Sequence, residues 1–218
     1  MSQRKDGFSS NFTRLDADQG YYLDGEEFLS EDGALKNINN IELNTSYTPT
    51  GSESTGTTYW DSANGVQSTV LGNGVIGQHF KEAFIDGQND TGATITNGTP
   101  VAYAGSIGNS GNFRIKKAQS SSSEPAFYFV GIVTEDVENG ETGKITTRGK
   151  VRGIQTNGAN YGESWSAGDI LYVSGSTAGY LTKTAPSAPT PAIPVALVIS
   201  THASNGTLEV RPTYPAKI

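Results

Sequence analysis

The chain has 218 residues, 22 acidic and 15 basic, so its formal net charge is −7. An acidic surface repels phosphate backbones, which argues against nucleic-acid binding. The sequence contains no cysteine and no apolar run long enough to span a bilayer, which excludes disulfides, thiol catalysis, cysteine-based zinc sites and helical membrane insertion.

Apolar residues are few for a chain of this length. Leu, Ile, Val and Phe together number 44 of 218 residues, and at about 20% a highly charged chain tends towards disorder. Charged residues make up only 17% here, and the apolar ones fall in short, well-spaced runs. We therefore expect a folded protein with a thin core that completes its burial against other chains.

Residues 1–55 differ in pattern from the rest of the chain. They combine an acidic tract with scattered aromatic residues, and no strand or helix period persists. EEFLSEDGALKNI (26–38) has room for a helical turn or two, and SYTPTGSESTGT (46–57) is a small, polar connector. Because such a segment cannot bury enough surface to fold alone, we expect an extended N-terminal arm that docks on a neighbouring surface.

Residues 56–84 form a second region. The stretch GTTYWDSANGVQSTVLGNG (56–74) runs from two bulky aromatics into a turn-forming cluster, and then alternates apolar and polar residues up to a second Asn-Gly. This pattern predicts a β-hairpin. The stretch holds no obvious nucleophile, base or metal ligand, so a structural role is expected for it.

Residues 85–218 contain short strand-like runs separated by turn residues. Asn-Gly occurs six times and Asp-Gly four times in the whole chain, and both pairs favour positive φ at the two central turn positions. The spacing without helical stretches predicts an all-β sandwich or barrel. The expected strands are TPVAYA (99–104), FRIKKA (113–118), AFYFVGIV (126–133), GKITT (143–147), VRGIQ (151–155), DILYVS (169–174), IPVALVIS (193–200) and TLEVR (207–211).

The character of these runs also predicts their burial. AFYFVGIV and IPVALVIS are nearly continuously apolar, so we expect central strands buried on both faces. FRIKKA and VRGIQ alternate between apolar and polar residues, so each should have one face exposed to solvent. KTAPSAPTPAIP (183–194) carries four prolines and should be an extended crossing between the last strands.

Residues suited to catalysis or to metal binding are sparse. The two histidines, His79 and His202, lack a nearby carboxylate that would complete a metal site, so neither a metal nor a cofactor is expected. Glu135 and Asp136 could in principle cleave a glycosidic bond, but they stand in TEDVENGETGK, which is typical of a polar loop between strands. We therefore expect no enzyme activity, and a polysaccharide-degrading enzyme is kept as the minor alternative.

Aromatic residues can also stack on sugars. Tyr161, Trp165, Tyr172 and Tyr180 fall within NYGESWSAGDILYVSGSTAGY (160–180). Core packing suits Tyr172 within its strand. Trp165 stands between polar residues in an expected loop, which makes it the candidate for a glycan contact at the surface.

Several segments, in order, resemble the C-terminal β domain of tailed-bacteriophage fibre proteins. The resemblance covers roughly residues 57–212, and GIVTEDVENGETGKI by itself is also similar to loops of small capsid-decoration proteins. The segments are TTYWDSANGVQSTVLGNGV, TGATITNGTPVAY, VGIVTEDVENGETGKITTRGKVRGI, AGDILYVSGSTAGYLTKTAPSAP and VISTHASNGTLEVRP.

The resemblance implies a homotrimer about a threefold axis and no catalytic residues. On that reading the hairpin of 56–84 is a trimerisation region, since three hairpins can share a core that one cannot form alone; an ordinary hairpin within one chain is the alternative. The side chains expected at the trimer interface are Tyr59, Trp60, Val66, Val70 and Leu71.

The resemblance also gives the arm a role. In virion proteins of this kind the N-terminal segment attaches to the particle, and this chain has no repeats that would build a long shaft. We expect a capsid-decoration protein or head fibre on the exterior of the virion, bound to the major capsid protein or another virion component; a tail fibre or adhesin tip that binds host-surface glycans is the alternative. The expected anchoring residues are Arg4, Lys5, Phe8, Phe12 and Arg14.

Overall fold

The protein is an all-β protein, which confirms the expected fold class. In the computed structural model about 40% of the residues are in strands and about 5% are helical. The structure describes residues 21–23, 26–29, 34–35, 38 and 40–213. The five residues expected to anchor the arm, at positions 4, 5, 8, 12 and 14, lie outside this part of the chain.

The chain divides into two compact units, Met1–Asn44 and Thr45–Ile218, so the division falls eleven residues before the expected one. In the first unit, β1 (Tyr21–Leu23) pairs antiparallel with β2 (Glu26–Leu29). The helical turn expected within 26–38 is therefore wrong for Glu26–Leu29. Leu23 pairs with Glu26, and the intervening Asp-Gly is a typical two-residue hairpin sequence.

The second unit begins with a three-stranded antiparallel sheet in the order β3-β4-β5. Its strands are β3 (Thr58–Asp61), β4 (Val66–Val70) and β5 (Ile76–Gln78). Alternation along β4 buries Val66, Ser68 and Val70 on one face. Residues 45–57 belong to this unit, because the Gly56 amide donates to the Val70 carbonyl at 2.8 Å.

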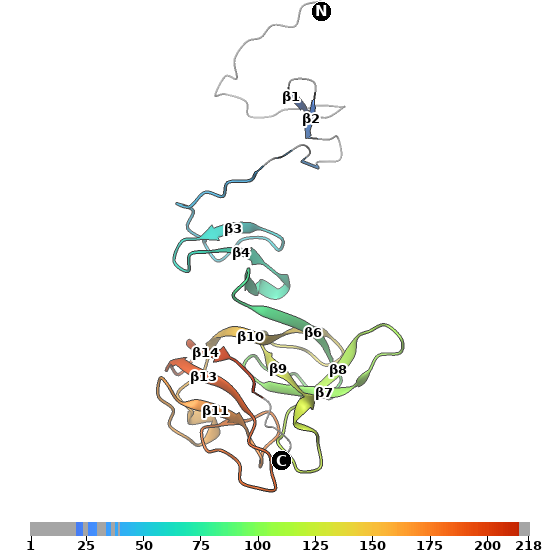
Figure 1. The fold of residues 1–218 in the computed structure, drawn as a ribbon, viewed down its shortest axis with the longest axis vertical. Helices are drawn as coiled ribbons and strands as arrows, with labels where there is room; N and C mark the ends of the chain where they lie inside the picture. The colour runs from blue at the N-terminus through green and yellow to red at the C-terminus, as the bar shows by residue number, and fades with distance from the viewer. Residues whose placement is uncertain (1–20, 24–25, 30–33, 36–37, 39, 214–218) are drawn as a thin grey trace, which may run out of the picture. The chain divides into compact units, whose positions relative to one another are not determined.

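A closed five-stranded barrel follows. β10 pairs with β6, β6 runs parallel to β8, and β7 joins β8 to β9, which returns to β10. Figure 1 shows these strands around one centre below β3 and β4. The barrel strands are β6 (Ala83–Asn89), β7 (Pro100–Ser106), β8 (Phe113–Lys117), β9 (Phe129–Val133) and β10 (Thr142–Ile154).

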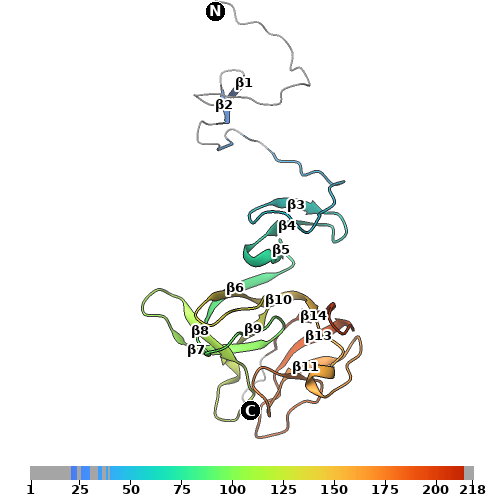
Figure 2. The same ribbon diagram turned by 180° about the vertical axis from the view of Figure 1, so that it is seen from behind.

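A second sheet extends from the barrel in the order β10-β14-β13-β11-β12. Its other strands are β11 (Ile170–Val173), β12 (Leu181–Thr182), β13 (Pro194–Ser200) and β14 (Gly206–Val210). The expected strands 143–147 and 151–155 are one strand, the 13-residue β10. Its first half closes the barrel and its second half pairs with β14, as both views show (Figures 1 and 2).

Two cores result from this arrangement. One fills the barrel, and the other lies between the second sheet and the outer face of β7 and β9. β9 contributes Val133 to the first core and Ile132 to the second, so the expectation that AFYFVGIV is buried on both faces is confirmed for β9. It is wrong for β13, where Leu197 and Ile199 face solvent.

The turn residues follow the expectation only in part. Asn73 and Gly74 both have positive φ, but at Asn64-Gly65 only the glycine does. Asp86-Gly87 is not a turn at all, because both residues lie inside β6. A Cβ on Gly87 would stand 2.7 Å from Ile115 Cγ2 and 2.8 Å from Ile145 Cδ1. The glycine is therefore needed because the barrel interior is already full at this level.

Candidate functional site

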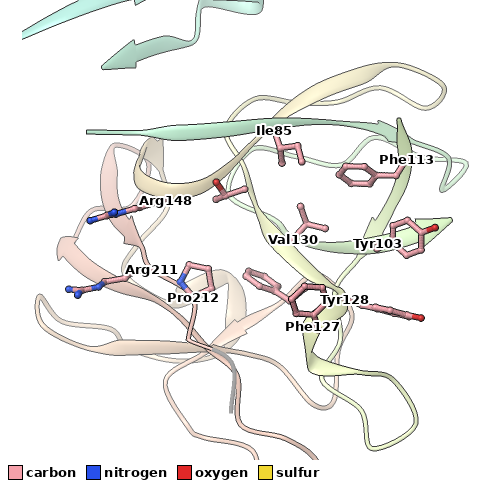
Figure 3. A pocket seen from close by; sticks show the side chains of 11 residues that line it. Ile85, Tyr103, Phe113, Phe127, Tyr128, Val130, Arg148, Arg211 and Pro212 are labelled. Atoms are coloured by element: carbon pink, nitrogen blue, oxygen red, sulfur yellow. The ribbon is translucent and has the colours of Figure 1, made fainter. Parts of the chain in front are cut away.

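One end of the barrel is open and forms a groove of about 690 Å³, which we call the barrel mouth. Each of the five barrel strands contributes at least one side chain to it, and these include Ile85, Tyr103, Phe113, Val130 and Thr147. Figure 3 shows Ile85, Phe113 and Val130 facing the same space. The remaining lining residues are Phe127, Tyr128, Phe129, Arg148, Arg211 and Pro212.

Aromatic rings form one side of the barrel mouth. The ring centroid of Tyr103 lies 6.0 Å from that of Phe113 and 5.7 Å from that of Tyr128, distances typical of favourable aromatic pairs. A short 3-10 helix, η2 (Ala126–Tyr128), precedes β9 and places Phe127 and Tyr128 at the rim. Phe127 is 77% exposed and Tyr128 is 40% exposed, so the rim presents a large apolar surface to solvent.

Two arginines form the opposite side. Arg148 precedes Gly149 in β10, Arg211 follows Val210 of β14, and Gly149 pairs with Val210, so the two arginines are cross-strand neighbours. Figure 3 shows both side chains extending in the same direction, with their guanidinium groups pointing away from Phe113 and Val130, so the charges lie at the outer edge of the groove. None of the eleven lining residues is acidic. Among the described residues neither guanidinium has a carboxylate within 4.0 Å. Arg148 also lines a neighbouring groove that contains Glu82 and Glu209.

The opposite end of the barrel is closed. Asn89 is fully buried there, and its Nδ2 donates to the carbonyls of Ala93 at 2.8 Å and Val137 at 2.7 Å. Ile95 and Val137 form a bridge across this end, and both side chains are buried. Together with the full interior at Gly87, this closure makes the barrel mouth a blind recess that a ligand can enter only from one side.

The acidic pair in the loop after β9 has structural partners. Glu135 is buried, and its Oε1 accepts from the Lys144 amide at 2.7 Å. Asp136 Oδ1 accepts from the Asn97 amide at 2.7 Å. Both carboxylates thus hold backbone amides of neighbouring segments. The burial of Glu135 differs from the polar, solvated loop that the sequence predicts.

Three of the five residues expected at a trimer interface are already covered within one chain. Tyr59, Val66 and Val70 are buried against the β3-β4-β5 sheet and its surroundings, and Tyr59 packs against Tyr47 with centroids 5.6 Å apart. These three side chains therefore have little surface to share with other copies. Trp60 and Leu71 are half-buried.

Trp165 does not lie at the surface, so its expected contact with a glycan is wrong. The side chain is 2% exposed and belongs to the second core. Its indole stacks on Tyr161, and its Nε1 donates to Glu163 Oε2 at 2.5 Å. Gly158 allows this packing, because its φ is +79° and a Cβ there would stand 2.8 Å from Trp165 Cδ1.

Glu163 connects this cluster to β12. It accepts hydrogen bonds from Thr182 Oγ1 at 2.5 Å and from the Lys183 amide at 2.9 Å. Burial alone would raise the pKa of Glu163, but the hydrogen bonds from Thr182, Lys183 and Trp165 outweigh it and lower the pKa. The loop of 158–165 is therefore held in place by an ionised carboxylate.

Both histidines have structural partners. Thr69 Oγ1 lies 2.9 Å from His79 Nε2, and His202 Nδ1 accepts from the amides of Ser204 and Asn205. In the part of the chain that the structure describes, no three His, Cys, Asp or Glu side chains gather to form a metal site. None of the described helical segments is long and apolar enough to cross a bilayer.

Comparisons with known proteins add no relative. No model of a known protein family matches the chain, and no curated protein matches its sequence. The class that the fold and the site define is an all-β protein whose closed barrel ends in an aromatic recess with two arginines at its edge.

None of the barrel-mouth residues was singled out from the sequence. The available signal was the period of two within neighbouring strands, since Tyr103 follows Val101 by two positions and Phe113 precedes Ile115 by two. Val101 and Ile115 are both fully buried in the barrel. Tyr103 and Phe113 therefore lie on the same inward face of their strands. The sequence did not predict that these five strands would close into a ring. It also did not predict which end of the barrel would stay open.

Proposed function

We propose that this protein is a structural component of a tailed-bacteriophage particle, a homotrimeric capsid-decoration protein or head fibre attached through its N-terminal arm. It acts without catalysis on the exterior of the virion, bound to the major capsid protein or another virion component. The resemblance of residues 57–212 to fibre domains supports this function, and the all-β architecture is compatible with it.

The observation that carries the proposal is the apolar surface of the arm. Leu35, Ile38 and Ile41 are 57%, 36% and 72% exposed, and the described residues 40–44 are outside regular secondary structure. Single exposed apolar residues are ordinary, but three within seven positions favour contact with another surface. An arm that docks on a virion protein would cover them.

An apolar strip on the second sheet supports self-association. Ile170 of β11 pairs with Leu197 of β13, and both are exposed together with Ile199. Because the expected hairpin residues are mostly buried within the chain, this strip and the half-buried Trp60 are better suited to contact copies of the chain. Burying such side chains would add to the thin core of each subunit.

Removal of the arm tests the proposal. Without residues 1–44 the trimer should persist and attachment to particles assembled without the protein should be lost. A matched pair of full-length variants refines the test: Leu35→Ser/Ile38→Ser/Ile41→Ser should weaken attachment, and Asn40→Ser/Glu42→Gln should not. Unchanged attachment of the truncated protein, or a monomer in sedimentation of the full chain at all concentrations, would contradict the proposal.

The alternative, a tail fibre or adhesin tip that binds host-surface glycans, has one observation in its favour. The aromatic rings of the barrel mouth could stack on sugar rings. A glycan array probed with the full chain separates the two functions, since a decoration protein should retain no glycan and an adhesin tip should retain a defined set.

A further inference from the structure

We infer that the barrel mouth is a docking site for an extended acidic peptide segment of a partner protein, in which a large apolar side chain stands next to carboxylates. The apolar side chain enters the recess between Phe113 and Val130, and the carboxylates pair with Arg148 and Arg211. The inference does not depend on the proposed function.

The recess has the size and lining of a binding site. Its volume of about 690 Å³ falls within the range of ligand pockets, and barrel mouths are common places for them. Its floor is apolar and its depth is limited by the full interior at Gly87. A side chain that enters therefore gains apolar contacts without opening the barrel.

The charge at the rim selects for an acidic occupant. Arg148 and Arg211 are neighbours across β10 and β14, and no lining residue carries a negative charge. Like charges on neighbouring strands repel each other, and a carboxylate placed between them relieves that repulsion and accepts charge-assisted hydrogen bonds. The guanidinium fork suits a carboxylate better than it suits a neutral group.

The lining favours a peptide over a sugar. A sugar needs several polar partners, but the recess offers few, and Thr147 Oγ1 already donates to the Ala83 carbonyl at 3.1 Å. Outside the recess, Phe127 and Tyr128 extend the apolar surface along the rim. Exposed aromatic residues combined with arginine are typical of the centre of protein–protein interfaces.

Binding of a matched peptide pair to the full-length protein tests the inference. The acidic probe is Gly-Glu-Phe-Glu-Tyr-Gly and the basic control is Gly-Lys-Phe-Lys-Tyr-Gly, both capped and fluorescently labelled. We expect the acidic probe to bind with a Kd on the order of 100 µM and the basic control to bind at least about tenfold more weakly. Raising the salt concentration should weaken binding of the acidic probe, because salt screens exposed charge pairs.

Variants of the protein locate the site. Arg148→Glu/Arg211→Glu should raise the Kd of the acidic probe by at least about tenfold. Phe127→Ser, at the exposed rim, should also raise this Kd without affecting the core. Lys117→Glu reverses a single charge on β8, outside the barrel mouth, and should leave binding unchanged; Arg148→Glu and Arg211→Glu made one at a time are the variants of equal charge change. Circular dichroism and the melting temperature of each variant confirm that the fold is retained.

Several outcomes would overturn the inference. One is equal affinity for the acidic and basic probes, or no binding of the acidic probe at about 1 mM. Tighter binding of phenylpropionate than of the peptide would instead indicate a small-molecule site, and binding of neutral glycans that the arginine variants leave intact would indicate a sugar site. A change in oligomeric state caused by Arg148→Glu/Arg211→Glu would assign the barrel mouth to contact between copies.

Discussion

The indole of Trp165 stacks on the phenol ring of Tyr161 with ring centroids 4.7 Å apart and planes inclined by 16°. Trp165→Ala should lower the free energy of unfolding by about 3–5 kcal/mol, because it leaves a large cavity in the second core. Trp165→Phe should cost less, since it keeps the stacking and loses the hydrogen bond to Glu163. Denaturant unfolding followed by circular dichroism measures both. A loss below about 1 kcal/mol for Trp165→Ala would contradict the buried position.

Glu53 should titrate at an unusually low pH. Its carboxylate accepts from the Thr50 amide at 2.6 Å and from the Tyr47 hydroxyl at 2.8 Å, and these hydrogen bonds lower its pKa from 4.5 to about 2. Because the pKa is lowered on folding, the stabilisation of the 47–53 turn is fully present above pH 4.5 and is lost as the pH falls towards 2.

An NMR titration of the Glu53 side-chain carboxyl carbon checks this value. Tyr47→Phe removes one donor and should raise the pKa of Glu53 towards its ordinary value. Glu53→Gln should remove the transition from the spectrum and so confirms its assignment. A midpoint near 4.5 in the unmodified protein would show that the turn does not hold the carboxylate as described.

Gly87→Ala should destabilise the barrel by about 1–3 kcal/mol, because the added methyl group meets Ile115 and Ile145 in an interior that is already full. Combining it with Ile145→Val should recover part of the loss. Gly72→Ala is the control, since the nearest atom to its Cβ would be Lys144 Nζ at 4.0 Å. Thermal unfolding of the three variants decides the matter, and equal melting temperatures for Gly87→Ala and Gly72→Ala would contradict the packing.

Phe80 combines a φ of +65° with a fully exposed side chain. Asparagine tolerates this backbone region better than phenylalanine does, so Phe80→Asn should raise the free energy of unfolding of the chain by up to about 1 kcal/mol. Phe80→Val should lower it, because a β-branched side chain fits the region poorly. Strain retained at an exposed aromatic residue favours a contact with another chain, and sedimentation of Phe80→Asn would show whether association weakens as the fold gains stability.

Much of the fold could be predicted from the sequence. Short apolar runs between glycine-rich turns predicted most strands of the barrel and the second sheet to within two residues, and the continuous apolar character of β9 correctly indicated burial on both faces. The prediction missed β6 and β12. It also extended β9 back over Ala126–Tyr128, which is a 3-10 helix. IPVALVIS has the same character, yet Leu197 and Ile199 are exposed. The pattern of a single strand does not tell whether the chain supplies a second layer to cover its other face.

The sites were less predictable, for physical reasons. Trp165 stands among polar residues, which suggested exposure, but Glu163 and Gly158 create a buried place for the ring that only the folded loop reveals. The barrel mouth joins residues from five strands and from the segment after β14. Such a site depends on closure and register, which residue spacing along the chain does not encode.

Because the barrel and the second sheet share β10, they should unfold together. One half of this strand is bonded into the barrel and the other half into the second sheet, so neither core can melt while the other keeps its complement of strands. Heating should therefore give one calorimetric peak for the barrel and the second sheet together. Proteolytic cleavage within β10 should unfold the barrel and the second sheet together, and neither should remain as a folded fragment.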